Sequence, residues 1–176
     1  FNNDGYCDVF MPFHSWAFGL TYKAKLFIYN PISAVLEDKS ELIFNNMGQE
    51  ATRKSIAADL NNDGILDVVM VSHPEALDSD LSHLDIVLSN GNGGWEQINI
   101  STASREAFTG YFHGCTLGDI DNDGDIDLLV GSGNVFTEGI ISYINDGNGN
   151  FIRDLPMLIG HENEISWSYT LELEDI

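Results

Sequence analysis

Short apolar, β-branched runs alternate with polar turns along the whole chain. Runs at residues 9–11, 68–71 and 128–130 have the length and composition of buried strands. Runs at residues 55–58, 115–118 and 168–171 precede an acidic cluster, and runs at residues 26–30, 86–89 and 142–145 lie further on in each repeat. An Asn-Gly pair follows the run at residues 86–89 and an Asp-Gly pair follows the run at residues 142–145, and both pairs predict hairpin turns. The pattern therefore predicts an all-β chain with about four strands per repeat and no helix.

Acidic clusters separate the first two strands of each repeat. Residues 59–67 and 119–127 share the template D-x-[DN]-x-D-G-x-x-D, residues 1–8 carry it without the first Asp, and residues 175–176 begin it again. The final Asp of the template falls at positions 8, 67 and 127, spacings of 59 and 60 residues. A repeat of four strands has the content of one β-propeller blade. The sequence predicts one partial propeller over residues 1–176, with repeats at approximately 1–52, 53–112 and 113–176.

The first repeat departs from this pattern in its second half. After the strand at residues 26–30, the turn is expected to become a longer surface insertion from residue 31 to about residue 40. The apolar run at residues 42–44 then provides the last strand.

The balance of charge excludes two classes of partner. The chain has 176 residues, 28 of them Asp or Glu and 7 of them Lys or Arg, giving a net charge of −21. This charge repels phosphate backbones and anionic lipid surfaces, which argues against nucleic-acid binding. No apolar run approaches the ~20 residues that span a bilayer, so membrane insertion is not expected.

Alternating oxygen-bearing side chains with Gly at the sixth position are typical of loops that wrap a hard cation such as calcium. The predicted Ca²⁺ ligands are Asp59, Asn61, Asp63, Asp67 and the carbonyl of Ile65 in one loop, and Asp119, Asp121, Asp123, Asp127 and the carbonyl of Asp125 in the other. A third, partial site would use Asn2, Asp4, Tyr6 and Asp8, with an Asp equivalent to Asp175 supplying the missing position.

Two alternatives to a calcium loop of this kind can be compared. An EF-hand needs a bidentate Glu at position twelve and a following helix, whereas this chain has Met70 and Val130 there and continues into strands. A metal-free, Asx-rich turn stays open as the second alternative.

These motifs, together with residues 109–119 and 143–151, resemble the FG-GAP repeat of integrin alpha-subunit propellers and the related VCBS repeats of bacterial surface and secreted proteins. The resemblance implies a ring that usually has about seven blades, structural calcium on one face and partner binding on the opposite face. Three blades cannot close a ring, and both ends of the chain fall within a motif, so the chain is expected to be a fragment of a longer protein. Alternatively, two copies form a six-bladed ring, with Asp175 of one completing the partial site of the other.

Comparison of the repeats also predicts a recognition surface at the strand ends far from the acidic loops. The candidate residues there are His14, Arg53, His73, His113 and Tyr169, with the aromatic residues Trp16, Phe112 and Trp167 close in sequence. They suit a protein or glycan ligand. In one alternative these aromatics only pack between blades. In another, the domain belongs to a polysaccharide lyase, with His113, Tyr169 and Arg53 as base, acid and charge neutraliser.

The favoured function is a calcium-binding, extracellular adhesion or recognition module, and the competing functions are the lyase-type enzyme domain and a structural spacer in a surface protein. An extracellular place follows from loops that work where calcium is abundant. Cys7 shares its template position with Leu66 and Ile126 and is expected to be buried as a small apolar residue.

Overall fold

The computed structural model describes residues 1–12, 24–43, 52–72, 84–89, 94–99, 112–132, 140–154 and 172–173, and the structural statements below concern these residues. The elements are β1 (Val9–Met11), β2 (Lys25–Asn30), β3 (Val35–Asp38), α1 (Ser40–Ile43), β4 (Thr52–Ala58), β5 (Asp67–Ser72), β6 (Leu84–Ser89), β7 (Trp95–Asn99), β8 (Phe112–Gly118), β9 (Asp127–Ser132), β10 (Ile140–Asn145) and β11 (Phe151–Asp154).

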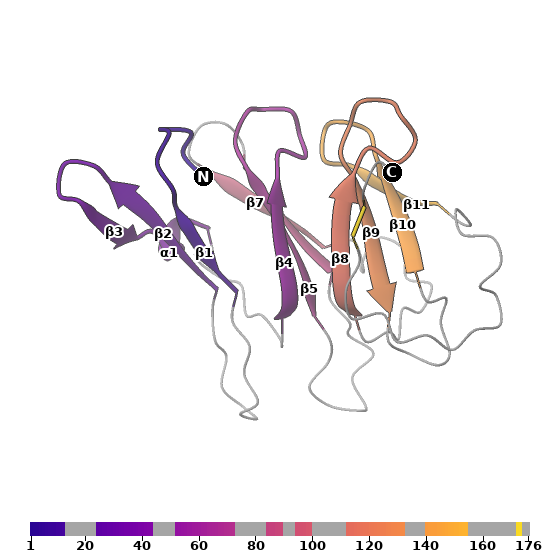
Figure 1. The fold of residues 1–176 in the computed structure, drawn as a ribbon, viewed down its shortest axis with the longest axis horizontal. Coiled ribbons are helices and arrows are strands. Elements are labelled where there is room, and N and C mark those ends of the chain that lie inside the picture. The colour runs from indigo at the N-terminus through magenta and orange to yellow at the C-terminus, as the bar shows by residue number, and fades with distance from the viewer. Residues whose placement is uncertain are drawn as a thin grey trace, which may run out of the picture.

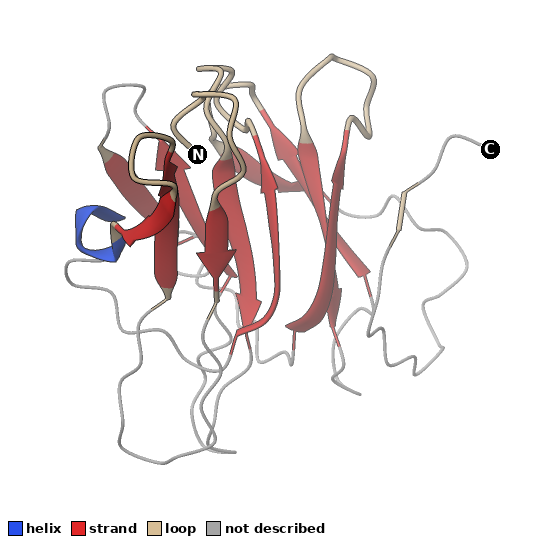
Figure 2. Cartoon of the chain, turned by 60° about the vertical axis from the view of Figure 1, so that its left-hand side comes forward, coloured by secondary structure: helices blue, strands red, loops and turns tan. Residues whose placement is uncertain are grey.

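The strands form three antiparallel sheets in which each strand pairs with its neighbour in sequence. Their orders are β1-β2-β3, β4-β5-β6-β7 and β8-β9-β10-β11. The sheets stand side by side, and the loops that enter β5 and β9 lie at the same edge of the molecule (Figures 1 and 2). The predicted all-β fold is confirmed, and these up-and-down sheets have the form of propeller blades.

The middle sheet is covered on both faces. Along β5, Val69 and Val71 belong to a cluster shared with the third sheet, while Val68 and Met70 belong to a second cluster that includes Ala24 and the first sheet. All six residues of β5 are buried. Because side chains alternate along a strand, a strand buried on both faces is apolar along its middle, as Val68, Val69, Met70 and Val71 of β5 are.

Residues of the acidic loops help to fill these two clusters. Leu60, the second residue of its loop, is 1% exposed and lies in the cluster between the middle and third sheets. Phe1 holds the equivalent position in the first repeat, and its ring centroid lies 6.3 Å from that of Phe10 and 6.0 Å from that of Trp95. The second position of the template therefore anchors each of these loops in the core.

The prediction of a long insertion in the first repeat is wrong. Residues 31–34 form a short turn that joins β2 to β3, so β3 is the last strand of that sheet. The backbone N–H and the hydroxyl of Ser40 donate to Asp38 Oδ1, at 3.0 and 2.5 Å, and Leu26 N donates to Ser40 Oγ at 3.0 Å. These bonds end β3 and start α1, a single helical turn of 4 residues where the sequence predicted the last strand.

Cys7 is exposed, contrary to the prediction. Leu66, at the same template position, is also 44% exposed. The next residue in both loops is the final Asp, which points inward, and the alternation of side chains along a strand turns Cys7 and Leu66 outward. Ile126, at the same template position of the third loop, is half-buried and packs against the cluster between the sheets.

Within the described ranges, the structure has no helix long and apolar enough to cross a membrane.

Candidate metal centre

The three acidic loops turn through the same backbone conformation. Asn3, Asn62 and Asn122 have φ angles of 55°, 58° and 62°, and the glycines two positions later have φ angles of 84°, 84° and 99°. Gly and Asn adopt this left-handed conformation at the lowest cost among the residues. The template therefore specifies the turn as well as the ligand types.

Side-chain oxygens of the second loop point at its own backbone. Asp59 accepts hydrogen bonds from the main-chain N–H groups of Asp63 at 3.1 Å and Gly64 at 2.9 Å. Asn61 Oδ1 accepts from Asp63 N at 3.1 Å, and Asp63 Oδ1 accepts from Ile65 N at 2.8 Å. These bonds direct the side-chain oxygens toward the interior of the turn.

The third loop repeats these bonds. Asp119 accepts from the main-chain N–H groups of Asp123 and Gly124, each at 3.1 Å. Asp121 Oδ1 accepts from Asp123 N at 3.2 Å, and Asp123 Oδ1 accepts from Asp125 N at 2.9 Å. A carboxylate has about four lone-pair sites, so each retains acceptor capacity for a cation.

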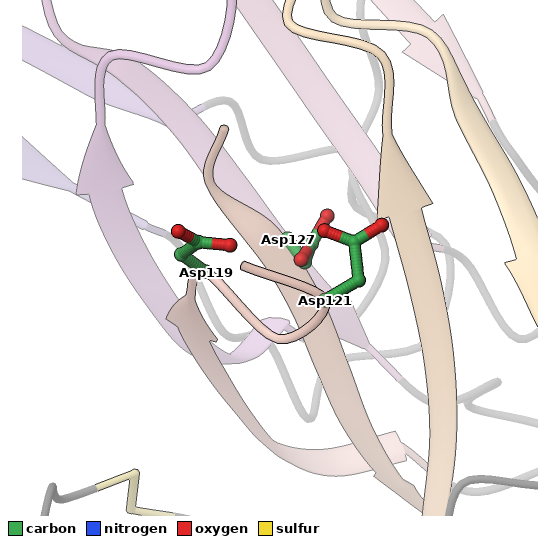
Figure 3. A group of neighbouring side chains, drawn as sticks. All are labelled: Asp119, Asp121 and Asp127. Atoms are coloured by element: carbon green, nitrogen blue, oxygen red, sulfur yellow. The ribbon is translucent and has the colours of Figure 1, made fainter. Parts of the chain in front are cut away.

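Three carboxylates of the third loop converge. One oxygen from each of Asp119, Asp121 and Asp127 lies within 4.8 Å of the other two, and Asp127 is drawn between the other two in Figure 3. Oxygens that share a calcium ion at ~2.3–2.6 Å are at most about 5 Å apart. The donor set is made only of oxygen and has this spacing, so the residues present fit calcium.

The carboxylates repel one another. Burial raises the pKa of Asp67 above its usual value, and the charges of Asp63 and Asp59 add to the rise. Desolvation also raises the pKa of Asp121, and the charge of Asp123 contributes. A bound cation would offset both the repulsion and the cost of desolvation.

The final Asp of each template clamps its loop to the strand that pairs with the one the loop enters, which is β2, β6 or β10. Its Oδ2 accepts from the main-chain nitrogen at the second template position, which for Phe1 is the N-terminal ammonium, always at 2.7 Å, and its Oδ1 accepts from a main-chain N–H on that strand at 2.6–2.8 Å. The contacts are Asp8 with Phe1 and Tyr29, Asp67 with Leu60 and Ser89, and Asp127 with Ile120 and Asn145. The sequence predicted these aspartates as metal ligands and did not predict the clamp.

Sequence comparison also missed Ser89. Its hydroxyl donates to Asp63 Oδ2 at 2.5 Å, and its carbonyl accepts from Asn61 Nδ2 at 2.7 Å. Ser89 ends β6 and is far in sequence from the loop, so only its place before the predicted hairpin turn could have drawn attention to it.

The first loop forms the same turn around fewer ligands. Asp4 Oδ1 accepts from Tyr6 N at 2.9 Å, and this bond lowers the pKa of Asp4. Asn2 Nδ2 also donates to Asp4 at 2.9 Å. Asp175, expected to supply the missing position in a copy of this loop, lies outside the described residues, so the partial site stays a prediction.

Two of the predicted recognition residues are described. Arg53 and His113 are half-buried near the starts of β4 and β8, each at a β-bulge in the pairing with the next strand. Each lies six positions before the first Asp of its acidic loop, about 20 Å along the strand. His14, His73 and Tyr169 lie outside the described residues, so ligand binding and the catalytic alternative stay predictions. Phe112 is 1% exposed within the cluster between sheets, which favours packing for this aromatic.

An all-β repeat fold and aspartate-rich loops that lead into β1, β5 and β9 define a class of propeller-type repeat proteins. Residues 59–130, from the second acidic loop into β9, match the family model of the FG-GAP-like repeat. This chain therefore carries an FG-GAP-like repeat, as its motifs predicted. A search of curated proteins found no match to the sequence.

Proposed function

We propose that this chain is a calcium-stabilised part of a β-propeller that acts outside the cell in adhesion or recognition of a protein or glycan partner. The observation that carries the proposal is the convergence of Asp119, Asp121 and Asp127 inside a stretch that matches the FG-GAP-like repeat. Further blades would come from the parent chain or from a second copy.

The loops would hold calcium through residues at fixed template positions. In the third loop these are Asp119, Asp121, Asp123, Asp127 and the carbonyl of Asp125, and in the second loop Asp59, Asn61, Asp63, Asp67 and the carbonyl of Ile65. The ion would supply the positive charge that the crowded carboxylates need. Each loop joins the first two strands of its sheet, so a rigid loop favours a fixed arrangement of those strands and of their far ends, where Arg53 and His113 lie.

The proposal is tested by thermal unfolding in calcium and in a chelator. Calcium at about 100 times its dissociation constant stabilises a folded protein by about 2.7 kcal/mol, so we expect the melting temperature to rise by about 5–11 °C. Asp119→Ala combined with Asp121→Ala should remove most of the rise. Asp146→Ala serves as the control, because Asp146 is an exposed acid of the β10–β11 hairpin.

A parent protein whose melting temperature does not respond to calcium would contradict the proposal and leave the loops as metal-free turns. Native mass spectrometry on the same samples shows whether copies associate. A glycan and protein array, probed with the calcium-loaded chain, then tests recognition, and loss of a captured ligand on Arg53→Ala or His113→Ala would place binding at the predicted surface.

A further inference from the structure

An asparagine side chain joins the second acidic loop to the third repeat. Asn62 Nδ2 donates to Asp125 Oδ1 at 3.0 Å and to the carbonyl oxygen of Gly147 at 3.1 Å. Asp125 belongs to the third acidic loop, and Gly147 belongs to the hairpin between β10 and β11. The main-chain carbonyl of Asp125 is one of the proposed calcium ligands, so Asn62 holds a residue of the neighbouring site.

A second, buried asparagine also joins the second and third acidic loops. Asn145, at the end of β10, is 2% exposed. Its Nδ2 donates to the carbonyl of Leu60 in the second loop at 2.8 Å and to the carbonyl of Ile126 in the third loop at 3.0 Å. Its main-chain N–H donates to Asp127 Oδ1 at 2.8 Å. One buried amide therefore holds the backbone of both loops and lies next to a proposed ligand.

The hairpin that carries Gly147 has little freedom to move between the loops. A Cβ on Gly147 would lie 2.4 Å from Asp125 Oδ2, and a Cβ on Gly149 would lie 2.4 Å from Leu88 Cδ1 on β6. Gly149 N also donates to Asn145 Oδ1 at 3.2 Å. Close packing on both sides means that a shift of the third loop is passed to the hairpin, and through Asn62 to the second loop.

The position of Asn145 is not occupied by Asn in the other two repeats. The clamp by the final Asp shows that Tyr29 and Ser89 are its equivalents. Ser89 bonds to Asn61 and Asp63 of its own loop. The second and third loops are therefore joined by an asparagine side chain, whereas the equivalent residues of the other two repeats, Tyr29 and Ser89, are not asparagines.

We propose that Asn62 and Asn145 couple the two acidic loops, so that calcium bound in one raises the affinity of the other. This coupling rests on the proposed calcium binding. Ordering one loop also orders residues of the other, so the second ion meets a loop that has already lost part of its conformational freedom. We expect a coupling of about 5- to 10-fold in affinity, at the lower end of the range for coupled sites.

The coupling is tested on the full chain by NMR with ¹⁵N-glycine. The amides of Gly64 and Gly124 donate to the first Asp of their own loops, so each reports on its own site during a calcium titration. Asp59→Ala with Asp63→Ala disables the second loop. In the parent, this change should raise the calcium midpoint at Gly124 about 5- to 10-fold.

The pair Asp59→Ala and Asp63→Ala is then introduced into a variant that lacks the side-chain bonds of Asn62 and Asn145. With Asn62→Gly and Asn145→Ser, disabling the second loop should shift the Gly124 midpoint less than about twofold, because the coupling of about 5- to 10-fold is gone. Both backgrounds lose the same two charges, so the comparison removes the direct electrostatic effect. Asn122→Gly is the control, since it removes an exposed side chain from the same left-handed position of the third loop and should leave the coupling intact.

The outcomes separate the two proposals. If both glycine amides respond to calcium in the parent but the Gly124 midpoint ignores the second loop, the coupling is overturned and calcium binding stands. If neither amide responds, calcium binding fails and the coupling with it. Asn62→Gly alone, at an exposed position, should reduce the coupling even if the Asn145→Ser chain does not fold, and an unchanged coupling in that variant would remove Asn62 from the proposal.

Discussion

Burial separates two kinds of aspartate within each acidic loop. Asp119 and Asp121 are exposed and meet only their own loop, whereas Asp67 and Asp127 are 0% exposed and accept backbone N–H groups from two different elements. The buried aspartates therefore support the folded structure itself, and the exposed ones would contribute mainly to the proposed calcium binding. Substitutions should separate these two contributions.

Asp127→Ala should destabilise the protein even without calcium. The substitution leaves the N–H groups of Ile120 and Asn145 without their carboxylate, and we expect a loss of about 3 kcal/mol in the free energy of unfolding. Urea unfolding in a chelator measures it. Asp119→Ala, as the control, should cost much less in chelator but should abolish most of the stabilisation by calcium. Equal losses for the two variants in chelator would contradict the distinction.

The pH dependence of stability should change sign with calcium. The pKa values of Asp67 and Asp121 are raised, so their protonation favours the fold: that contribution is complete below the ordinary Asp value near 4 and is lost as the pH rises through the raised values. In chelator, the free energy of unfolding should therefore increase as the pH falls from neutral toward about 4. With calcium it should decrease, because protons compete with the ion.

Urea unfolding across this range checks the prediction. Asp4 and Asp146 have lowered pKa values because hydrogen bonds stabilise their charged forms, so their contributions are lost only below about pH 4. Asp121→Asn should flatten the slope in chelator. A chelated protein that only loses stability as the pH falls from neutral toward about 4 would argue against the raised pKa values.

The two cysteines should differ in reactivity. Cys115 is fully buried, and burial raises the pKa of its thiol to about 11, whereas Cys7 is exposed. A thiol reagent at neutral pH should therefore modify one cysteine rapidly and the other only after denaturant is added. Peptide mapping identifies the modified residue, and rapid labelling of Cys115 in the folded protein would contradict its position in the core.

For individual residues, the sequence predicted the features that are contained within the nine residues of one acidic template. The template predicted the loops and the sharp turn at the sixth-position Gly, because these are local properties, and its oxygen ligands stay a prediction. It could not give Asn145, whose amide meets Leu60 85 positions away, or Ser89, 26 positions from Asp63. The prediction that Cys7 is buried was wrong because it relied on the apolar residues at the same template position, Leu66 and Ile126, which were expected to be buried.

Among the elements, the β10–β11 hairpin packs most closely against a neighbouring sheet at Gly149. Gly149 has a φ of 79°, and a Cβ there would lie 2.4 Å from Leu88 Cδ1. Gly149→Ala should therefore destabilise the protein by about 1–3 kcal/mol, from the left-handed backbone and from overpacking. Thermal unfolding in chelator measures the loss.

Asn148→Ala is the matched control for the hairpin. Asn148 is exposed and bonds only to Asp146 within the same turn. We expect its replacement to cost less than that of Gly149, and the reverse order would show that the hairpin is not held tightly against Leu88.

The sequence predicted the strands of the second and third repeats well, because apolar runs and acidic loops bound them on both sides. It failed between β3 and α1, where the apolar residues 42–44 followed a polar stretch and were taken as a strand. The bonds from Ser40 to Asp38 and from Leu26 to Ser40 decide that region. Such local side-chain bonds compete with strand pairing and leave no periodic signal.

For the whole molecule, the middle sheet should be the most stable part. β5 is buried along its entire length, while two of the three residues of β1 and three of the four of β3 are exposed. Native-state hydrogen exchange should therefore be slowest for amides of β5 and β6 and faster for those of β1 and β3. Mass spectrometry of peptides after exchange in calcium makes the comparison. Equal protection of all three sheets would show that they open as one unit.

A repeat whose sheet packs against another sheet on each face can be duplicated in tandem, because the new copy makes the same two sheet-to-sheet contacts. In β5, Val68 and Met70 meet the preceding sheet, and Val69 and Val71 meet the following one. A duplicated repeat of 59 or 60 residues would carry both faces with it, and deletion of one whole repeat would bring equivalent faces together. A duplicated half-repeat would instead leave one apolar face open to water. Genes for such chains should therefore grow and shrink in steps of one repeat, with breakpoints at matching positions of successive acidic loops.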